Sequence, residues 1–255
     1  MKKSILCAII LILCAAMIFA GCGKDDTKKE EVKEQTPAAT EADTGYDTTS
    51  PKSASWFDSA VFVGDSVTLK LSYYCEEHPE ALGEAAFYCA GSLGYTNALW
   101  DLDAEDTAHP EYEGTTHLVE DCVEITGKKN VFIMLGMNDI GMYGTQGAMD
   151  SCKEIVSRIL KKSPDAHLYL QSVTPMIENG PLDSDSFNNT LIKEFDGLLK
   201  TYCDENGYKY LDVYSVMADA NGNLPMEYCS DPEAMGLHFS DVACEKWADY
   251  LKNNA

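Results

Sequence analysis

Basic residues are scarce in this chain of 255 residues, which has 19 Lys and Arg against 42 Asp and Glu and a formal net charge of −23. We expect no nucleic-acid partner, because phosphate binding requires Lys and Arg clustered on one face. The acidic surface favours neutral or cationic substrates over polyanions. A hydrophobic content of 45% is that of a globular protein with a core, and it excludes fully disordered and multi-span membrane classes.

Paired cysteines are also missing, since none of the ten cysteines forms a Cys-x-x-Cys pair. Many zinc sites are built on such pairs, so we expect no metal site. Seven cysteines follow residue 54, and an odd number cannot all pair. The sequence therefore predicts buried free thiols, with one bridge between Cys229 and Cys244 as an open alternative.

No apolar run reaches the roughly 20 residues that a membrane-spanning helix needs. The longest, Ile5 to Ala20, has sixteen residues and follows Lys2 and Lys3. This pattern predicts a signal peptide over residues 1–21. Its ending, Phe19-Ala20-Gly21-Cys22, resembles the bacterial lipobox with Phe in place of the usual Leu, which implies a lipid anchor on Cys22. An ordinary signal peptide with an incidental Cys is the alternative.

Large apolar side chains are almost absent from residues 22–54, which are rich in Lys, Glu, Asp, Thr and Pro. Such a segment cannot bury enough surface to order itself, so we expect a disordered tether. A flexible segment of this length has a root-mean-square reach of about 30 Å. The sequence thus predicts a domain over residues 55–255 that is membrane-bound through Cys22, at the outer face of the cytoplasmic membrane.

Apolar runs alternate with amphipathic segments along this domain. The runs cover residues 60–64, 85–90, 130–135, 167–171 and 208–213. Their length and composition predict five buried strands of a parallel sheet. Helical spacing marks residues 152–160, 191–202 and 241–252, and Asn206-Gly207 is a typical helix end. The pattern predicts an α/β domain of three layers with right-handed crossovers.

Small and polar residues follow the first three of these runs. Ser66, Gly91 and Asn138 each come shortly after a strand, and His238 precedes the last helix. Because the loops after parallel strands gather at one edge of the sheet, these residues are expected to meet there. Each one alone could be an ordinary turn residue. Together they predict an acyl-transfer site, with Ser66 as nucleophile and His238 as proton carrier. The N–H groups of Ser66 and Gly91 and the Asn138 amide would hold the oxyanion.

The four blocks resemble those of the SGNH hydrolases, also called the GDSL family of esterases and lipases. The resemblance covers about residues 56–252, and its first block reads Gly-Asp-Ser-Val here in place of Gly-Asp-Ser-Leu. It implies the same roles for Ser66, Gly91, Asn138 and His238, and no cofactor. It also implies a flavodoxin-like α/β/α sandwich in which five parallel strands are ordered 2-1-3-4-5.

One position departs from the family pattern, because Met235 stands where the family has an Asp three residues before the His. The local sequence looks like the family's Ser-Asp-Gly-x-His with Pro-Glu-Ala-Met inserted after Asp231. Asp231 is expected to orient His238 if the insertion loops out. Glu233 or a backbone carbonyl are the alternatives.

The sequence therefore predicts a membrane-tethered serine esterase that cleaves short acyl esters, chiefly acetyl, on small molecules or acylated glycans. No long apolar segment is present to shelter a fatty chain. Two other functions stay open: a glycan-binding lipoprotein without activity, and a lysophospholipase-type lipid esterase, which the acidic surface disfavours. We expect residues 100–116 to shape the pocket, with Met137, Met142 or Tyr143 contributing to it.

Overall fold

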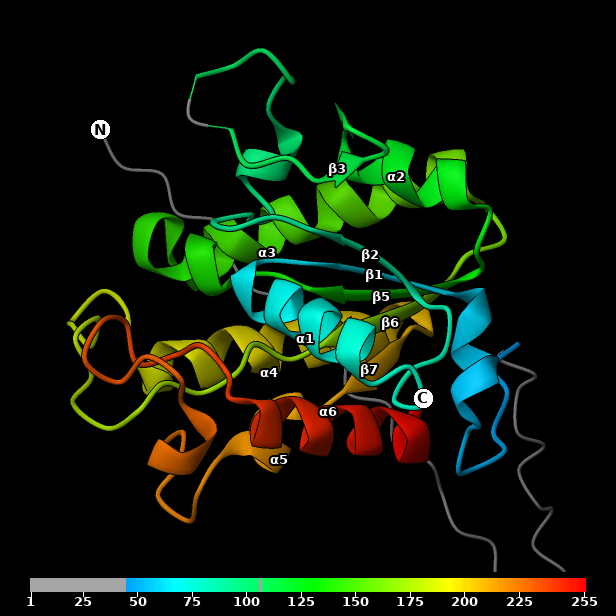
Figure 1. Ribbon diagram of the computed structural model, residues 1–255. Coiled ribbons are helices and arrows are strands. Elements are labelled where there is room, and N and C mark those ends of the chain that lie inside the picture. The colour runs from blue at the N-terminus through cyan, green and yellow to red at the C-terminus, as the bar shows by residue number, and fades with distance from the viewer. Residues whose placement is uncertain (1–44, 106) are drawn as a thin grey trace, which may run out of the picture. The chain divides into compact units, whose positions relative to one another are not determined.

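Five parallel strands form the centre of the protein in the computed structural model, which describes residues 45–105 and 107–255 (Figure 1). The predicted signal peptide, Cys22 and most of the predicted tether lie outside the described residues. The sheet has the order β2-β1-β5-β6-β7. Its strands are β1 (Ala60–Gly64), β2 (Ala86–Cys89), β5 (Asn130–Met134), β6 (His167–Gln171) and β7 (Lys209–Leu211). All five lie where the sequence predicted strands, in the predicted order.

Helices cover both faces of this sheet, which confirms the predicted three-layer α/β/α fold. One face carries α1 (Ser66–Glu77), α5 (Val213–Met217) and α6 (Asp241–Asn254). The other carries α2 (Val119–Thr126), α3 (Met137–Lys162) and α4 (Asn189–Asn206). Figure 1 shows α2 and α3 on one side of the sheet and α1 and α6 on the other. As predicted, α4 ends at Gly207, which adopts the left-handed conformation with φ 73°.

A row of aromatic rings crosses four strands of the sheet. Phe87, Phe62, Phe132 and Tyr169 are neighbours in register, and successive ring centroids lie 4.9, 4.6 and 4.4 Å apart with nearly parallel planes. Two residues after Tyr169, on the same face of β6, Gln171 accepts a hydrogen bond from Trp247 of α6. The row therefore lies beneath α1 and α6. Each such ring pair contributes about 0.5–1.5 kcal/mol beyond the burial of its surface.

The ordered domain begins earlier than the predicted boundary at residue 55. The Tyr46 hydroxyl donates to the carbonyl of Leu168 (2.8 Å), and its ring meets Tyr169 edge-on with centroids 5.2 Å apart. The Lys52 N–H donates to the carbonyl of Lys252 (2.7 Å). Residues 45–54 were predicted to belong to the tether because they contain almost no large apolar side chains. The Tyr46 contacts with β6 and the Lys52 hydrogen bond to α6 attach this segment to the domain.

Residues 100–116 contain a small antiparallel hairpin made of β3 (Glu111–Tyr112) and β4 (Thr115–Thr116). The ring of Tyr112 meets that of Tyr88 in the edge strand β2, with centroids 5.3 Å apart. The hairpin thus covers the edge of the sheet. None of the described residues between 100 and 116 lines the cavity that contains Ser66, so the expectation that this segment shapes the pocket is wrong for the described part of the chain.

The seven cysteines of the described residues are all free thiols, and six of them are buried. Cys229 and Cys244 therefore form no bridge in this structure. Burial raises the pKa of Cys152 to about 12, which keeps this thiol protonated and unreactive. Within the described ranges, no helix is both long and apolar enough to span a bilayer.

Candidate active site

Ser66 is placed at the start of a helix by the turn that follows β1. Asp65 caps α1 by accepting a hydrogen bond from the Val67 N–H (2.9 Å), and Ser66 is the first residue of the helix. The first N–H groups of a helix have no partner inside it, and the helix dipole favours negative charge there. The backbone N–H of Ser66 can therefore stabilise an anion that forms beside its own side chain.

The structure brings Ser66, His238 and Asp231 into one hydrogen-bonded chain. His238 Nε2 lies 2.8 Å from Ser66 Oγ, and His238 Nδ1 lies 2.6 Å from Asp231 Oδ2. Asp231 is thus the residue that contacts His238, as favoured over Glu233 and a backbone carbonyl. Glu233 is exposed to solvent.

A tight turn brings Asp231 next to His238 despite the inserted residues. The backbone carbonyl of Asp231 accepts hydrogen bonds from the N–H groups of Ala234, Met235 and Gly236. Its Oδ1 accepts two more, from the N–H groups of Leu237 (3.2 Å) and His238 (3.1 Å). The insertion Pro232–Met235 therefore loops out around the aspartate, as the sequence required if Asp231 was to reach the imidazole.

The protonation of this chain follows from the hydrogen bonds to Asp231. Burial alone would raise the pKa of Asp231, but the hydrogen bonds from the side chain and backbone of His238 bring it below the usual value. The carboxylate is therefore ionised and accepts the proton of His238 Nδ1. In the neutral imidazole, Nε2 is then free to accept the proton of the Ser66 hydroxyl.

Gly91 and Asn138, the other two predicted oxyanion donors, line the same cavity as Ser66 and His238. A Cβ atom at Gly91 would meet no protein atom within 4 Å, so packing does not require a glycine here. The space beside its backbone is therefore free for a ligand. Asn138 Nδ2 donates to the carbonyl of Leu93 (3.0 Å). An amide nitrogen has two hydrogens, which leaves one for a ligand.

Asp139 fixes the loop that follows Gly91, a role that the sequence analysis missed. Its two carboxylate oxygens accept hydrogen bonds from the N–H groups of Tyr95 and Thr96, each at 2.8 Å. Gly94 packs against this carboxylate so closely that a Cβ would lie 2.6 Å from Asp139 Oδ2. The available signal was the position of this acid, directly after the predicted oxyanion residue Asn138.

The cavity that contains Ser66 has a volume of about 540 Å³. Met137 and Met142 line it as expected, whereas Tyr143 does not. The lining residues are Ser66, Gly91, Ser92, Met137, Asn138, Gly141, Met142, Leu182, Ser184, Phe187, Met235, Leu237 and His238. His238 is the only ionisable group among these described residues, although the protein carries a large net charge. The cavity therefore suits an uncharged group.

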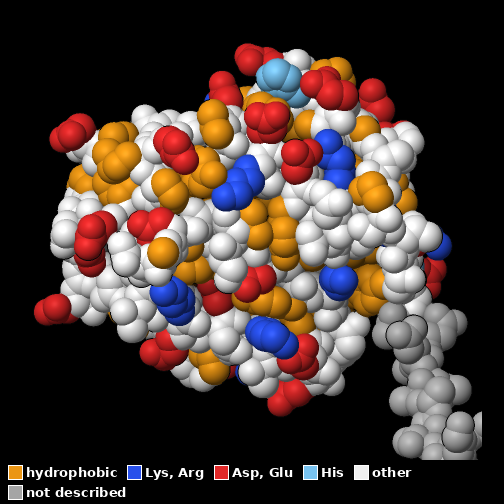
Figure 2. All heavy atoms as spheres, turned by 90° about the horizontal axis from the view of Figure 1, so that it is seen from below, with side chains coloured by type: hydrophobic (Ala, Val, Ile, Leu, Met, Phe, Trp, Pro, Cys, Tyr) orange, Lys and Arg blue, Asp and Glu red, His pale blue; other side chains and the backbone are white. Residues whose placement is uncertain are grey.

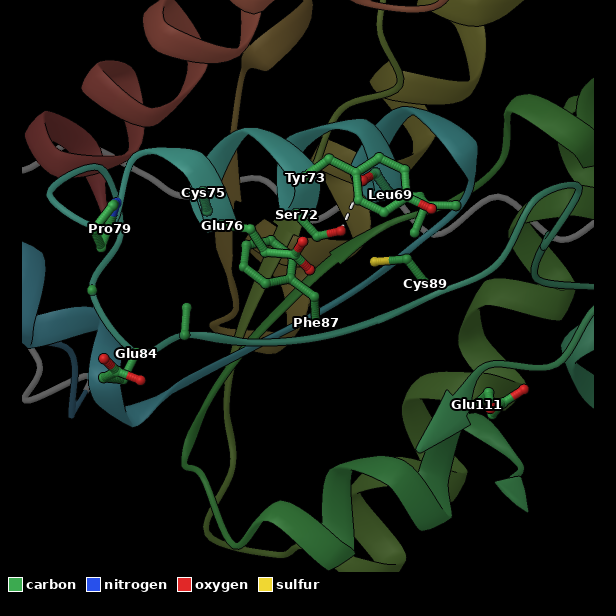
Figure 3. A pocket seen from close by; sticks show the side chains of 12 residues that line it. Leu69, Ser72, Tyr73, Cys75, Glu76, Pro79, Glu84, Phe87, Cys89 and Glu111 are labelled. Atoms are coloured by element: carbon green, nitrogen blue, oxygen red, sulfur yellow. Dashed lines mark hydrogen bonds between the residues drawn. The ribbon is translucent and has the colours of Figure 1, made fainter. Parts of the chain in front are cut away.

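A second cavity of about 520 Å³ lies between α1 and the edge strand β2 (Figure 3). Ser72, Cys75 and Glu76 of α1 face it across from Phe87 and Cys89 of β2. The Ser72 hydroxyl donates to the carbonyl of Leu69 within its own helix. No histidine is among the described residues that line this cavity, so it offers no pair of nucleophile and base.

Asp65 is a buried acid that directly precedes Ser66. Burial raises the pKa of Asp65 to about 6, from a value of 3.8 for the free group. The folded protein therefore holds a proton on Asp65 between about pH 4 and pH 6, where the unfolded chain has lost it. Because the folded state binds the proton more tightly, the free energy of unfolding falls as the pH rises through this window.

We expect Asp65→Asn to unfold at a higher urea concentration than the wild type at pH 8, with the difference shrinking towards pH 4. The amide oxygen can still cap α1, while the cost of a buried charge, up to about 3 kcal/mol, is removed. Urea unfolding at both pH values measures this. Asp150→Asn on the exposed face of α3 is the matched control and should show no pH-dependent gain. A wild type that is the more stable of the two at pH 8 would contradict the account.

Comparisons with known proteins agree with this geometry. The model of a family described as GDSL-like lipase/acylhydrolase matches residues 62–244. Among curated proteins, none matches this chain. A solved GDSL-like lipase from Bacteroides thetaiotaomicron is similar at 14% identity and a TM-score of 0.57, over 78% of this chain and 87% of that one. A solved acetyl xylan esterase is similar at 13% identity and a TM-score of 0.53, over 75% of this chain and 96% of that one.

Proposed function

Because the chain belongs to the GDSL-like lipase/acylhydrolase family, we propose that it is a serine esterase that works through an acyl-enzyme on Ser66. The observation that carries this proposal is the continuous chain from Ser66 Oγ through His238 to Asp231, with distances of 2.8 and 2.6 Å. A nucleophile, a base and a group that orients the base are the three parts that serine hydrolysis requires.

In the proposed mechanism, Ser66 Oγ attacks the ester carbonyl while its proton moves to His238 Nε2. Asp231 stabilises the imidazolium that forms and keeps the ring oriented. The N–H groups of Ser66 and Gly91 and the Asn138 amide hold the oxyanion. His238 then gives its proton to the leaving alcohol, which leaves the acyl group on Ser66. A water molecule then attacks the acyl group on Ser66 while His238 takes its proton. His238 passes this proton to Ser66 Oγ, and the carboxylic acid is released.

The substrate that we propose is a neutral ester with a short acyl group, such as acetyl, carried by a small molecule or a glycan. The described cavity lining contains no ionisable side chain other than His238, which supports a neutral substrate. Similarity to an acetyl xylan esterase is in line with an acylated glycan. The lipobox-like sequence at Cys22 supports a protein anchored at the outer face of the cytoplasmic membrane.

Acidic side chains are spread over the face that contains α5 and α6, and they outnumber the Lys and Arg side chains that lie between them (Figure 2). Such a surface repels anionic membranes and polyanionic wall polymers at low salt. It therefore disfavours lipid-esterase activity relative to the cleavage of a neutral ester.

Acetate release from acetylated xylan, compared with fatty-acid release from lysophosphatidylcholine, tests the proposed substrate. We expect the purified protein to release acetate at a rate at least tenfold above fatty acid at equal ester concentration, since the sequence offers no long apolar segment to shelter a fatty chain. Chemically deacetylated xylan serves as the control. Faster release of fatty acid would favour the lipid esterase, and xylan binding without any release would favour a glycan-binding protein.

A further inference from the structure

Three large apolar side chains stand exposed around the mouth of the cavity that contains Ser66. Met142 is 76% exposed, Met235 46% and Leu182 39%, and all three line this cavity. We call these three residues the apolar rim. Exposed apolar groups beside a cavity of this kind are typical of a surface that binds the apolar part of a ligand.

Met235 belongs to the insertion that separates Asp231 from His238, and the insertion is held rigidly. Three N–H groups of the turn converge on the carbonyl of Asp231. At the other end, the Ile177 N–H donates to the carbonyl of Gly236 (2.9 Å). Gly236 has φ 74°, and a Cβ there would lie 2.7 Å from Ile177 Cγ1, so the turn packs directly on its neighbour. Met235 is therefore fixed at its backbone close to the catalytic histidine.

Leu182 and Met142 come from two other segments that meet this turn. Leu182 lies in the loop between β6 and α4, whose residues Ser184 and Phe187 form a short antiparallel bridge. Phe187 packs on α3, because a Cβ at Gly141 would lie 3.3 Å from Phe187 Cβ. Met142 is the next residue of α3. The rim thus joins the start of α3, the β6–α4 loop and the inserted turn.

We propose that the apolar rim determines specificity, with Met235 of the inserted turn packing against an apolar portion of the ester that extends about four carbons or more from the carbonyl. This assignment rests on the proposed esterase function and extends its substrate class beyond acetyl esters of sugars. The apolar portion belongs either to the acyl group or to the alcohol. Met is well suited to this contact, because its unbranched, polarisable side chain adapts to different shapes.

The effect of the rim can be measured as a ratio of rates. Each methylene group that loses contact with an apolar surface lowers transition-state binding by roughly three- to fivefold. For Met235→Ala we expect kcat/KM for para-nitrophenyl octanoate, divided by that for the acetate, to fall at least fivefold relative to the wild type. Met235→Leu restores apolar contact and should recover most of the ratio.

Two series of esters distinguish the source of the apolar portion. In one, the acyl group grows from acetate through butyrate and hexanoate to octanoate on para-nitrophenol. In the other, the alcohol of an acetate ester grows from ethyl to butyl to hexyl. Met226→Ala is the matched control, because Met226 is exposed to 61% and does not line the cavity. A changed length preference in either series, in Met235→Ala but not in Met226→Ala, supports the assignment.

An unchanged length preference in both series would overturn the role of the rim while leaving the esterase intact, provided that hydrolysis still depends on Ser66. Absence of any Ser66-dependent hydrolysis in the wild type would instead overturn the proposed esterase, and the rim assignment with it. Urea unfolding of Met235→Ala, compared with the wild type, shows whether the substitution lowers the stability of the folded protein.

Discussion

Ser66→Ala is expected to lower kcat/KM for para-nitrophenyl acetate by about 10⁴-fold or more. The side chain of Ser66 forms a hydrogen bond with His238 and lines the cavity. The substitution therefore removes the nucleophile without disturbing the core. His238→Ala should cost a similar factor, because without the base the hydroxyl keeps its proton. The double variant should be no slower than either single variant, since nucleophile and base act as one unit.

Ser72→Ala is the matched control for this experiment. Ser72 lies on the same helix, and its hydroxyl donates only to the carbonyl of Leu69 in the preceding turn. We expect it to keep wild-type activity. Covalent labelling by a fluorophosphonate, located by mass spectrometry, gives a readout that does not depend on the choice of ester. Labelling of the wild type at a residue other than Ser66 would refute the assignment of the nucleophile.

Asp231→Asn is expected to reduce kcat by about 10³- to 10⁴-fold. The asparagine oxygen can still accept the N–H groups of Leu237 and His238, which Asp231 Oδ1 accepts in the wild type. Its NH₂ group would then face His238 Nδ1 and favour the tautomer with the proton on Nε2. That tautomer cannot accept the proton of Ser66. The loss should appear in kcat, measured with saturating ester, more than in KM.

Glu233→Gln distinguishes Asp231 from the other acid of the inserted turn. Glu233 is exposed, and its substitution should leave kcat within about twofold of the wild type. If Glu233→Gln lost as much activity as Asp231→Asn, the orienting role would have to be shared or reassigned. Urea unfolding of both variants separates an effect on the imidazole from an effect on the turn, because Asp231 also holds backbone N–H groups.

Much of the fold could be predicted from local sequence, because buried parallel strands are apolar throughout. β1 and β5 are buried at every position, and apart from Asn130 at the start of β5 both appear in the sequence as apolar runs. The strand order came from the resemblance of the Gly-Asp-Ser-Val block and its companions to a known family. Ser66, Gly91, Asn138 and His238 could be placed together because the ends of parallel strands meet at one edge.

The features that the sequence did not reveal depend on contacts between distant residues. Asp139 serves as the acceptor for a loop more than forty residues earlier, with a separation of 44 positions to Tyr95. The sequence places an acid beside Asn138, but it does not show which distant N–H groups that acid accepts. The attachment of Tyr46 to β6 is another such contact, across 122 positions. In the inserted turn, Asp231 was one of three candidates, because its approach depends on five hydrogen bonds that only a folded turn contains.

The aromatic row beneath α1 and α6 also affects the register in which the strands pair. Successive side chains of a strand point to opposite faces, so a slip of one residue in β1, β2 or β5 would turn its ring away from the others. In the observed register, Gly64 is paired with both Cys89 and Met134, and these residues lie just before Ser66, Gly91 and Asn138. A slip would move one of these three by about 3.3 Å along the sheet, more than a hydrogen bond tolerates. The stacked rings in the interior of the protein thereby favour the strand register that brings together the three groups proposed to hold the oxyanion.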